Sequence, residues 1–240
     1  MKKYNKIDEK EILESYNKNT VIHYFNARKR GTFINTYLTT PNLRSVLKEN
    51  IEGKDVLDIG CAFGEDIEWC LKNKVKSITG IEINEHFIKL AKQNQFLKNI
   101  QIYNLSAYDV NILNLKFDII YANLVFDQIE NLDLVFNKLS SILNKNGKIV
   151  FSVVHPLNSL TNDYFINNKN YFTPKSHNNK IPYYTRNFEI YSNLFHKNDL
   201  YIEKIIEAKP LNSAKFKFPV NYVKYSKLPG IVIFSVIKKN

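Results

Sequence analysis

Cysteines and long apolar segments are both scarce in this sequence, and their scarcity excludes several classes of protein. Among 240 residues there are only two cysteines, Cys61 and Cys70, which lie close together instead of forming the spaced framework of a disulfide-rich secreted domain. No apolar run is long enough to span a membrane, and the N-terminal lysines lead into the charged residues 8–11 rather than into an apolar signal core. We therefore expect a soluble cytoplasmic protein that does not insert into a membrane.

Two ligand-binding patterns are also missing. The cysteines have no companion cysteine or closely spaced histidine at zinc-ligand intervals, so we expect no metal site. The glycine-rich turn also lacks the G-x-G-x-x-G pattern of dinucleotide-binding proteins: with Gly60 as the middle glycine, Asp58 and Phe63 occupy the other two positions. A carboxylate at Asp58 would repel a pyrophosphate, and the turn is therefore expected to meet a ligand that is cationic at this end.

Basic residues outnumber acidic ones, with 34 Lys and Arg against 23 Asp and Glu and a formal net charge of +11. Such a charge favours anionic partners such as nucleic acid, an anionic membrane surface or an acidic metabolite. The lysines are scattered, however, and many stand beside asparagine, as expected of an AT-rich bacterial genome. We interpret the charge mainly as composition and keep a nucleic-acid substrate as the less favoured alternative.

Short apolar runs alternate with longer amphipathic stretches from residue 54 onward, a pattern typical of a parallel sheet with helices on both faces. The predicted strands are 55–59, 77–83, 100–104, 117–122, 148–154, 200–207 and 231–237. The predicted helices between the first five strands are 65–73, 85–97 and 132–144. Gly147 is expected to take the left-handed conformation that ends the last of these helices.

Two regions lie outside this alternation. The spacing of apolar residues predicts helices over 9–25 and 41–49, so residues 1–50 are expected to form an N-terminal helical cap on a core of 51–240. Within that core, 157–199 is predicted to be an insertion or lid after the fifth strand, because the sequence there becomes rich in Asn, Tyr, Phe and Pro.

The segment VLDIGCAFGE, which begins at Val56, combines an apolar strand, an acid and a small-residue turn that leads into a helix. Ligands bind beyond the carboxyl ends of parallel strands, where Gly60 and Gly64 would let the backbone approach one closely. Glu82, in TGIEIN at the end of the second strand, follows at about the twenty-residue separation typical of a carboxylate that binds ribose hydroxyls.

In order and spacing, these motifs resemble those of the class I S-adenosylmethionine-dependent methyltransferases, in particular the bacterial small-molecule group. The family's Asp-x-Gly-x-Gly-x-Gly stands here as DIGCAFG, with Ala62 in place of the middle glycine. The resemblance continues through TGIEIN, IQIYNLSAYD, FDIIYANLVFDQIENL and LNKNGKIVFSVVHP, and covers residues 56–156. It implies a Rossmann-like α/β fold with a seven-stranded, mostly parallel sheet, S-adenosylmethionine as the cofactor and S-adenosylhomocysteine as the product.

The resemblance also implies roles for residues of the first two strands. Asp58 would hold the turn and contact the methionine end of the cofactor, and the backbone of Gly60, Cys61 and Gly64 would line it. Glu82 would bind the ribose hydroxyls.

Further residues are implied for the nucleobase and for the methionine ammonium group. Ile83 would pack on the adenine, and Ser106 with the Ala107 amide would meet its edge, although many relatives carry an aspartate where Ser106 stands. Asn123, after the fourth strand, would place its backbone near the ammonium group.

The N-terminal cap is expected to close over the cofactor with its aromatic residues at 23–25. Arg28 is the candidate to bind the methionine carboxylate, and Arg30 fits nearly as well. Either arginine could instead be a solvated helix residue of the ARKR segment.

Methyl transfer from a sulfonium is an in-line displacement, for which the protein positions the acceptor and excludes water. An oxygen acceptor usually also needs a base, and His155 and Asp127 are the candidates after the fifth and fourth strands. The alternative for His155 is a histidine that binds a loop and stiffens the turn before Pro156. The alternative for Asp127 is a helix N-cap or a surface acid.

Aromatic residues of the predicted lid would either wall an acceptor pocket or form the core of an inserted hairpin. They are Tyr164, Phe165, Tyr171, Phe172, Tyr183, Tyr184 and Phe188. His177 and Arg186 lie among them, and Arg186 would favour an acidic or phosphorylated acceptor if it pointed inward.

The favoured function is O- or N-methylation of a small molecule such as a sugar or a nucleotide-linked metabolite, by a monomer or homodimer. The first alternative is a tRNA or rRNA methyltransferase, which the charge favours. Residues 123–126 read NLVF, however, without the prolines of an NPPY-type tetrad, and no appended RNA-binding module is recognised. The second alternative is a cofactor-binding protein without catalysis, which the intact Asp58, Gly60, Gly64 and Glu82 disfavour.

Overall fold

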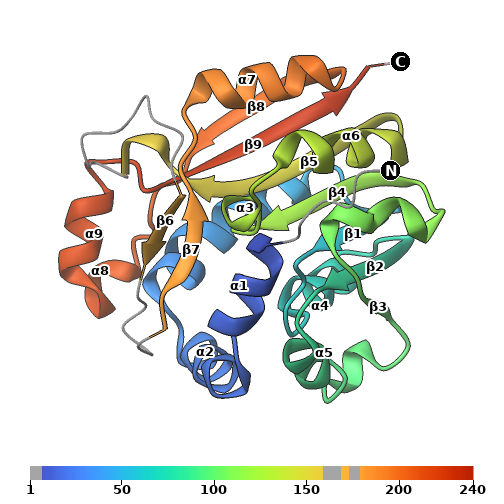
Figure 1. The fold of residues 1–240 in the computed structure, drawn as a ribbon. Coiled ribbons are helices and arrows are strands. Elements are labelled where there is room, and N and C mark those ends of the chain that lie inside the picture. The colour runs from blue at the N-terminus through green and yellow to red at the C-terminus, as the bar shows by residue number, and fades with distance from the viewer. Residues whose placement is uncertain (1–6, 159–168, 173–178, 240) are drawn as a thin grey trace.

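The computed structural model describes residues 7–158, 169–172 and 179–239, and its centre is a seven-stranded sheet (Figure 1). The strand order is β3-β2-β1-β4-β5-β9-β8, in which β9 alone is antiparallel to its neighbours. The strands are β1 (Asp55–Ile59), β2 (Ser77–Glu82), β3 (Gln101–Asn104), β4 (Phe117–Asn123), β5 (Leu143–Val154), β8 (Leu200–Glu207) and β9 (Ile231–Lys238). The predicted Rossmann-like, mostly parallel sheet is therefore confirmed.

Helices cover both faces of the sheet because its central strands are apolar on both sides. Along β1, Val56 faces one hydrophobic cluster, whereas Leu57 and Ile59 face the other. The cluster around Val56 includes side chains of α3 (Thr40–Lys48), α4 (Glu65–Lys72) and α5 (Glu85–Ala91). The opposite cluster includes side chains of α6 (Leu132–Ile142), α7 (Phe188–Lys197) and the 3₁₀ helices η3 (Ala107–Leu113) and η4 (Phe126–Gln128).

Two predicted helices are interrupted by asparagine caps. The helix predicted over 9–25 is in fact two, α1 (Ile7–Ser15) and α2 (Lys18–Arg30), because the side chain of Asn17 caps α2 by accepting from the N–H groups of its first turn. The helix predicted over 85–97 ends at Ala91, and Asn94 caps the separate 3₁₀ turn η2 (Gln95–Leu97). The segment η1 (Phe33–Thr39) is a π-helix that continues directly into α3.

The prediction that Gly147 ends a helix in the left-handed conformation is wrong. Helix α6 ends at Ile142 and β5 begins at the next residue. The start of β5 was therefore predicted five residues too late. Asn146 takes the left-handed conformation, with φ of +60°. A Cβ atom on Gly147 would lie 2.8 Å from the carbonyl oxygen of Asn144, so this glycine provides space rather than a left-handed turn.

A second, two-stranded sheet packs beside α1, where it is drawn in brown and orange (Figure 1). It pairs β6 (Lys169–Phe172) with β7 (Ile181–Tyr184) in antiparallel register. Lys169 forms an ion pair with Glu11 of α1, and the Tyr171 hydroxyl donates to the same carboxylate at 2.8 Å. The predicted lid residues Tyr164, Phe165 and His177 lie outside the described residues.

The connection between β8 and β9 carries two short helices, α8 (Ala214–Lys217) and α9 (Pro219–Tyr225). They pack against η1 through aromatic contacts, since Phe33 stacks on Tyr225 and contacts Phe218 edge to face. Within the described part of the chain, no helix has the length and apolar character needed to cross a membrane.

Phe151 of β5 should be a major contributor to stability, because it is fully buried and its ring contacts those of Phe126, Phe136 and Phe234. We expect Phe151→Ala to lower the free energy of unfolding by about 3–5 kcal/mol in urea titrations. Phe216→Ala, at a residue that is 90% exposed, should change it by less than about 0.5 kcal/mol. Equal losses in the two variants would contradict this assignment of the core.

Candidate active site

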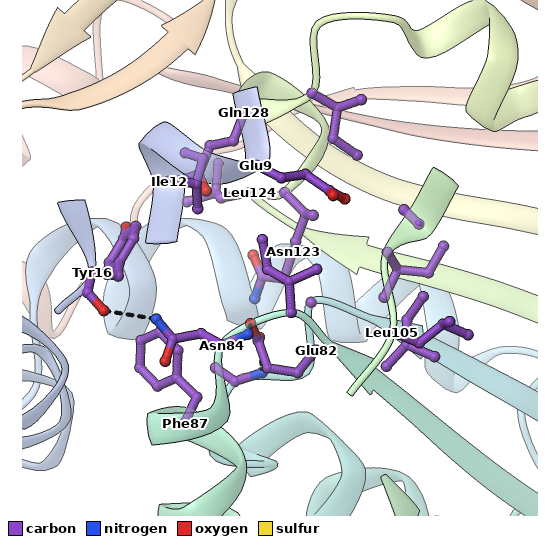
Figure 2. Close-up of a pocket in the computed structure, with 18 of the residues that line it drawn as sticks. Glu9, Ile12, Tyr16, Glu82, Asn84, Phe87, Leu105, Asn123, Leu124 and Gln128 are labelled. Atoms are coloured by element: carbon purple, nitrogen blue, oxygen red, sulfur yellow. Dashed lines mark hydrogen bonds between the residues drawn. The ribbon is translucent and has the colours of Figure 1, made fainter. Parts of the chain in front are cut away.

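A cleft opens at the carboxyl ends of β1, β2 and β4, beneath helix α1 (Figure 2). Its empty volume is about 850 Å³ including the open mouth. The strand ends and the turns that follow them contribute Ile59, Gly60, Ile81, Glu82, Ile83, Leu105, Ala107 and Asn123 to its lining. The N-terminal helices contribute Glu9, Ile12, Tyr16 and Tyr24.

The turn after β1 shapes the floor of this cleft. Gly60 has φ of +67°, and a Cβ atom there would lie 2.5 Å from Cγ2 of Val125, so the position requires glycine for both conformation and space. Gly64 begins α4 at φ of +81°. Ala62, in place of the family's middle glycine, is also left-handed at φ of +47°, and its N–H donates to Oε2 of Glu82 at 3.0 Å.

Glu82 is buried at the centre of the cleft, where its carboxylate joins two turns. Oε2 accepts from Ala62 N–H, and Oε1 accepts from Asn84 N–H at 2.9 Å. Burial raises the pKa of Glu82 to about 7, although these backbone donors oppose the shift. The predicted ribose-binding acid therefore lies in the cleft and is held in one orientation.

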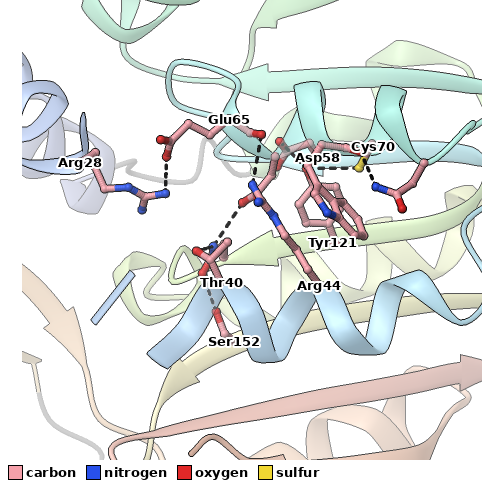
Figure 3. A network of polar contacts seen from close by, with 12 residues as sticks. Arg28, Thr40, Arg44, Asp58, Glu65, Cys70, Tyr121 and Ser152 are labelled. Carbon is pink, nitrogen blue, oxygen red and sulfur yellow. Dashed lines mark hydrogen bonds and ion pairs between the residues drawn. The ribbon is translucent and has the colours of Figure 1, made fainter. Parts of the chain in front are cut away.

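An acidic hollow, with an empty volume of about 370 Å³ including its open side, adjoins the cleft and shares Tyr24, Gly60, Ala62 and Asn123 with it. The predicted residues Arg28, Asp58, Cys61 and Asn123 line this hollow together with Glu65 and Asp66 (Figure 3 shows the surrounding network). Glu65 and Asp66 were not among the predicted site residues, although they directly follow the glycine turn in the GEDIE segment.

The predicted cationic and acidic residues of the hollow are already paired. Arg28 forms an ion pair with Glu65, and Asp58 is buried and accepts from the Tyr121 hydroxyl at 2.8 Å. Burial raises the pKa of Asp58 well above its ordinary range. Arg30 does not belong to the residues that line the hollow; its carbonyl oxygen accepts from Nζ of Lys217 at 2.6 Å.

Residues of the predicted cofactor site also hold the surrounding strands and helices together. The backbone N–H groups of Gly60 and Cys61 both donate to the Ile81 carbonyl, at 2.8 and 3.1 Å, so they join β1 to β2. The Asn123 side chain donates to Thr40 and Asp66, which joins the end of β4 to α3 and α4.

The predicted nucleobase end lies after β3. Ile83 and Ala107 line the cleft, whereas Ser106 stands just behind the lining. The Ser106 hydroxyl accepts from Tyr108 N–H at 2.9 Å and donates to the carboxylate of Glu9, which does line the cleft. Glu9 was missed because it is 97 residues away from Ser106 in the sequence.

His155 binds the loop that follows β5, as the alternative interpretation of this residue predicted. Its Nδ1 accepts from Leu157 N–H at 3.2 Å, so Nε2 carries the proton and donates to Glu207 at 3.1 Å. The side chain is buried, which lowers its pKa, and it does not belong to the lining of the cleft or the hollow.

Asp127 is buried in η4, so its interpretation as an N-cap or surface acid is wrong. Helix α6 is capped by Asn131 instead. Oδ2 of Asp127 accepts from Val154 N–H at 2.9 Å. Burial raises the pKa of Asp127 to about 7, against the opposing effects of this hydrogen bond and of the nearby positive charge of Arg186.

Arg186 does not point into the cleft, so the expected preference for an acidic acceptor has no basis here. Its buried guanidinium donates to the backbone carbonyls of Phe126, Ile129 and Glu130, and thereby braces the loop between β4 and α6. Of the predicted lid aromatics, Phe188 packs against the His155 ring and the core. In the described part of the chain, no group of three or more His, Cys, Asp or Glu residues is arranged to hold a metal ion.

Comparisons with known proteins converge on one family. A family model described as a methyltransferase domain matches residues 50–201. Malonyl-[acyl-carrier protein] O-methyltransferase of Bacillus cereus is 31% identical over 117 residues, 46% of this chain and 42% of that protein. Ribosomal protein L11 methyltransferase of Fusobacterium nucleatum is 28% identical over 169 residues, 63% of this chain and 52% of that protein. The chain thus spans about half the length of the curated relatives it matches.

The fold is also that of a solved S-adenosylmethionine-dependent methyltransferase from Mesorhizobium loti. The two superpose with a TM-score of 0.71 at 18% sequence identity, over 87% of this chain and 99% of that one. At this identity the likeness concerns the fold.

The buried carboxyl of Asp127 should make stability depend on pH. Folding raises its pKa from 3.8 to about 7, so the neutral form is favoured in the folded state and this contribution to stability is lost as the pH rises from about 4 to 7. Asp127→Asn keeps an oxygen for Val154 N–H but carries no charge. Its free energy of unfolding, relative to that of wild type, should be higher at pH 8 than at pH 4 by a few kcal/mol, since one pKa unit corresponds to about 1.4 kcal/mol.

Urea titrations at both pH values measure this difference. Asp133→Asn is the matched control, because it alters an exposed acid of α6 that pairs with Lys197 of α7. This variant should show no comparable change. A difference between wild type and Asp127→Asn that is the same at pH 4 and pH 8 would contradict the shifted pKa.

Proposed function

Because this chain belongs to the methyltransferase-domain family, we propose that it transfers a methyl group from S-adenosylmethionine to a small-molecule acceptor. The observation that carries the proposal is the continuity of the cleft with the acidic hollow across the ends of β2, β1 and β4. A ligand with one charged end and one flat apolar end fits such a site.

The charges of the hollow suit the methionine end of the cofactor. The acidic side chains of Glu65 and Asp66 would balance its ammonium group, whose charge would also favour the ionised form of Asp58. Arg28 would bind the carboxylate of the cofactor in exchange for part of its pairing with Glu65. Gly60 lines both the cleft and the hollow, where its lack of a side chain would let the sulfur region approach the backbone.

The other end of the cleft suits an adenosine. When ionised, Glu82 offers only acceptors, which suits the donating ribose hydroxyls, and its two backbone donors already hold its orientation. Ile83 and Ala107 supply apolar walls for the base.

The cofactor supplies an electrophilic methyl group on its sulfonium, and the protein positions the acceptor and excludes water. Neither predicted base lines the cleft or the hollow, but Asp127 fits a proton acceptor better than His155 does. Its raised pKa of about 7 matches a base that works near neutrality, and its neighbours Phe126 and Gln128 are in the same short helix, the latter in the cleft lining. Both ring nitrogens of His155 are engaged by other groups.

A small acceptor is favoured over RNA because helix α1 covers the cleft and acidic side chains line it. Helix α1 roofs it, and the carboxylates of Glu9 and Glu82 line it, which would repel a polyanion. In this proposal residues 1–50 act as the cap, and 157–199 as an acceptor-side insertion on the core of 51–240.

The acceptor class can be tested with S-adenosylmethionine that carries a tritiated methyl group. We expect the purified protein to label the low-molecular-mass fraction of a bacterial extract, rather than its RNA or protein. Gly60→Ala should abolish labelling because its Cβ would meet Val125 at 2.5 Å, whereas Gly53→Ala, also at positive φ but with open space around it, should retain it. Label confined to RNA or protein would overturn the small-molecule proposal, and no transfer to any fraction would favour a binding protein without catalysis.

The raised pKa of Glu82 predicts pH-dependent cofactor binding. Ribose hydroxyls favour the ionised carboxylate, so affinity for S-adenosylhomocysteine should rise roughly tenfold between pH 6 and pH 8, as the pH passes the pKa of about 7. Isothermal titration calorimetry measures this change. Glu82→Gln should bind more weakly without this dependence, and Glu85→Gln, at an exposed acid of the next helix, should behave as wild type. An affinity of the wild type that does not vary over this range would contradict the assignment.

A further inference from the structure

We propose that Glu9, from the N-terminal helix, makes this site selective for a nucleobase that carries an exocyclic amine. The inference rests on the proposed cofactor site and concerns the end of the cleft that lies after β3. Glu9 lines the cleft, and its carboxylate extends from α1 toward the side on which Leu105 lies (Figure 2).

The position of Glu9 follows from the strand order. The acidic hollow lies at the end of β1, Glu82 ends β2, and Ser106 follows β3, so the three stand over adjacent strands in the order β1, β2, β3. Two strand spacings separate the hollow from Ser106, about 10 Å. A ligand with its charged end in the hollow and its ribose at Glu82 therefore presents its base to Glu9, with Ser106 directly behind the lining.

The hydrogen bonds of Ser106 explain why Glu9 matters for the choice of base. A hydroxyl can donate or accept, so a serine alone does not distinguish an amine from a carbonyl. Here the Ser106 hydroxyl donates to the Glu9 carboxylate and accepts from Tyr108 N–H at 2.9 Å. Glu9 thus directs the only hydroxyl hydrogen of Ser106 away from the ligand.

Both groups at this end of the cleft consequently act as acceptors. An ionised carboxylate has no hydrogen to donate, and the hydrogen of Ser106 is committed to it. An exocyclic amine, which is a donor, would be bound, whereas a carbonyl oxygen at the same position would meet only lone pairs. The selectivity of the site is therefore set from the cap, 97 residues away from Ser106 in the sequence.

The neighbouring acid of the same helix provides a matched control. Glu11 accepts from Lys169 and Tyr171 of the β6–β7 hairpin and does not belong to the lining of the cleft. Glu9→Gln and Glu11→Gln thus remove the same charge from α1, two residues apart, but only the first alters the group that faces the ligand.

The test compares S-adenosylhomocysteine with S-inosylhomocysteine, in which a carbonyl oxygen replaces the exocyclic amine. Wild type should bind the adenosyl compound at least about tenfold more tightly, as expected for a hydrogen bond to a charged group. In Glu9→Gln the ratio should fall to within about threefold, because an amide can donate to the carbonyl. Glu11→Gln should keep the wild-type ratio, and adding Ser106→Asp to Glu9→Gln should restore much of the discrimination by returning a carboxylate to this end.

The possible results separate this proposal from the cofactor assignment. If Glu9→Gln keeps the wild-type ratio, or if Glu9→Gln and Glu11→Gln weaken both compounds equally, Glu9 does not select the base and the proposal is overturned. If wild type binds neither compound, the cofactor site itself is misassigned. Thermal unfolding of each variant checks that a lost ratio does not reflect a lost fold.

Discussion

The carboxylate of Glu82 holds together the two backbone turns on which the cleft is built. One oxygen binds the N–H of Ala62 after β1, and the other binds the N–H of Asn84 after β2. Burying a carboxylate is costly, and these backbone donors offset part of the cost. The floor of the cleft therefore depends on a group that would also contact the ligand, and the burial that raises its pKa outweighs the backbone donors that lower it.

The cap depends on this floor as well. Nδ2 of Asn84 donates to the backbone carbonyl of Tyr16 at 2.7 Å, which anchors the end of α1 to the turn after β2. On its other side α1 is held by the hairpin, where the Ser15 hydroxyl donates to the carbonyl of Lys180 at 2.8 Å. Glu9 reaches the cleft because α1 is fixed on both sides, and so a cap residue can take part in ligand recognition.

Several polar residues near the cleft brace the backbone. The side chains of His155 and Arg186 bind backbone groups of the loops that follow β5 and β4, and that of Asp127 binds the last residue of β5. A polar residue at the end of a strand can turn toward a ligand or toward a neighbouring loop, and sequence position is the same in both cases. This is why His155 and Arg186 were plausible functional residues in the sequence and have structural contacts in the fold.

The sequence by itself determined the parallel sheet, the glycine turn and the position of Glu82, because each depends on local periodicity, on residues without a bulky side chain, or on a fixed separation along the chain. β1 was predicted at its observed bounds, whereas the start of β5 and the conformation of Gly147 were wrong, since pairing with β4 extends β5 back to the end of α6. Only the tertiary structure decided that Glu9 reaches Ser106, that Glu65 pairs with Arg28 and that His155 faces Glu207. These contacts join residues 37 to 97 positions apart, and their formation depends on how the cap and loops pack, which no local pattern encodes.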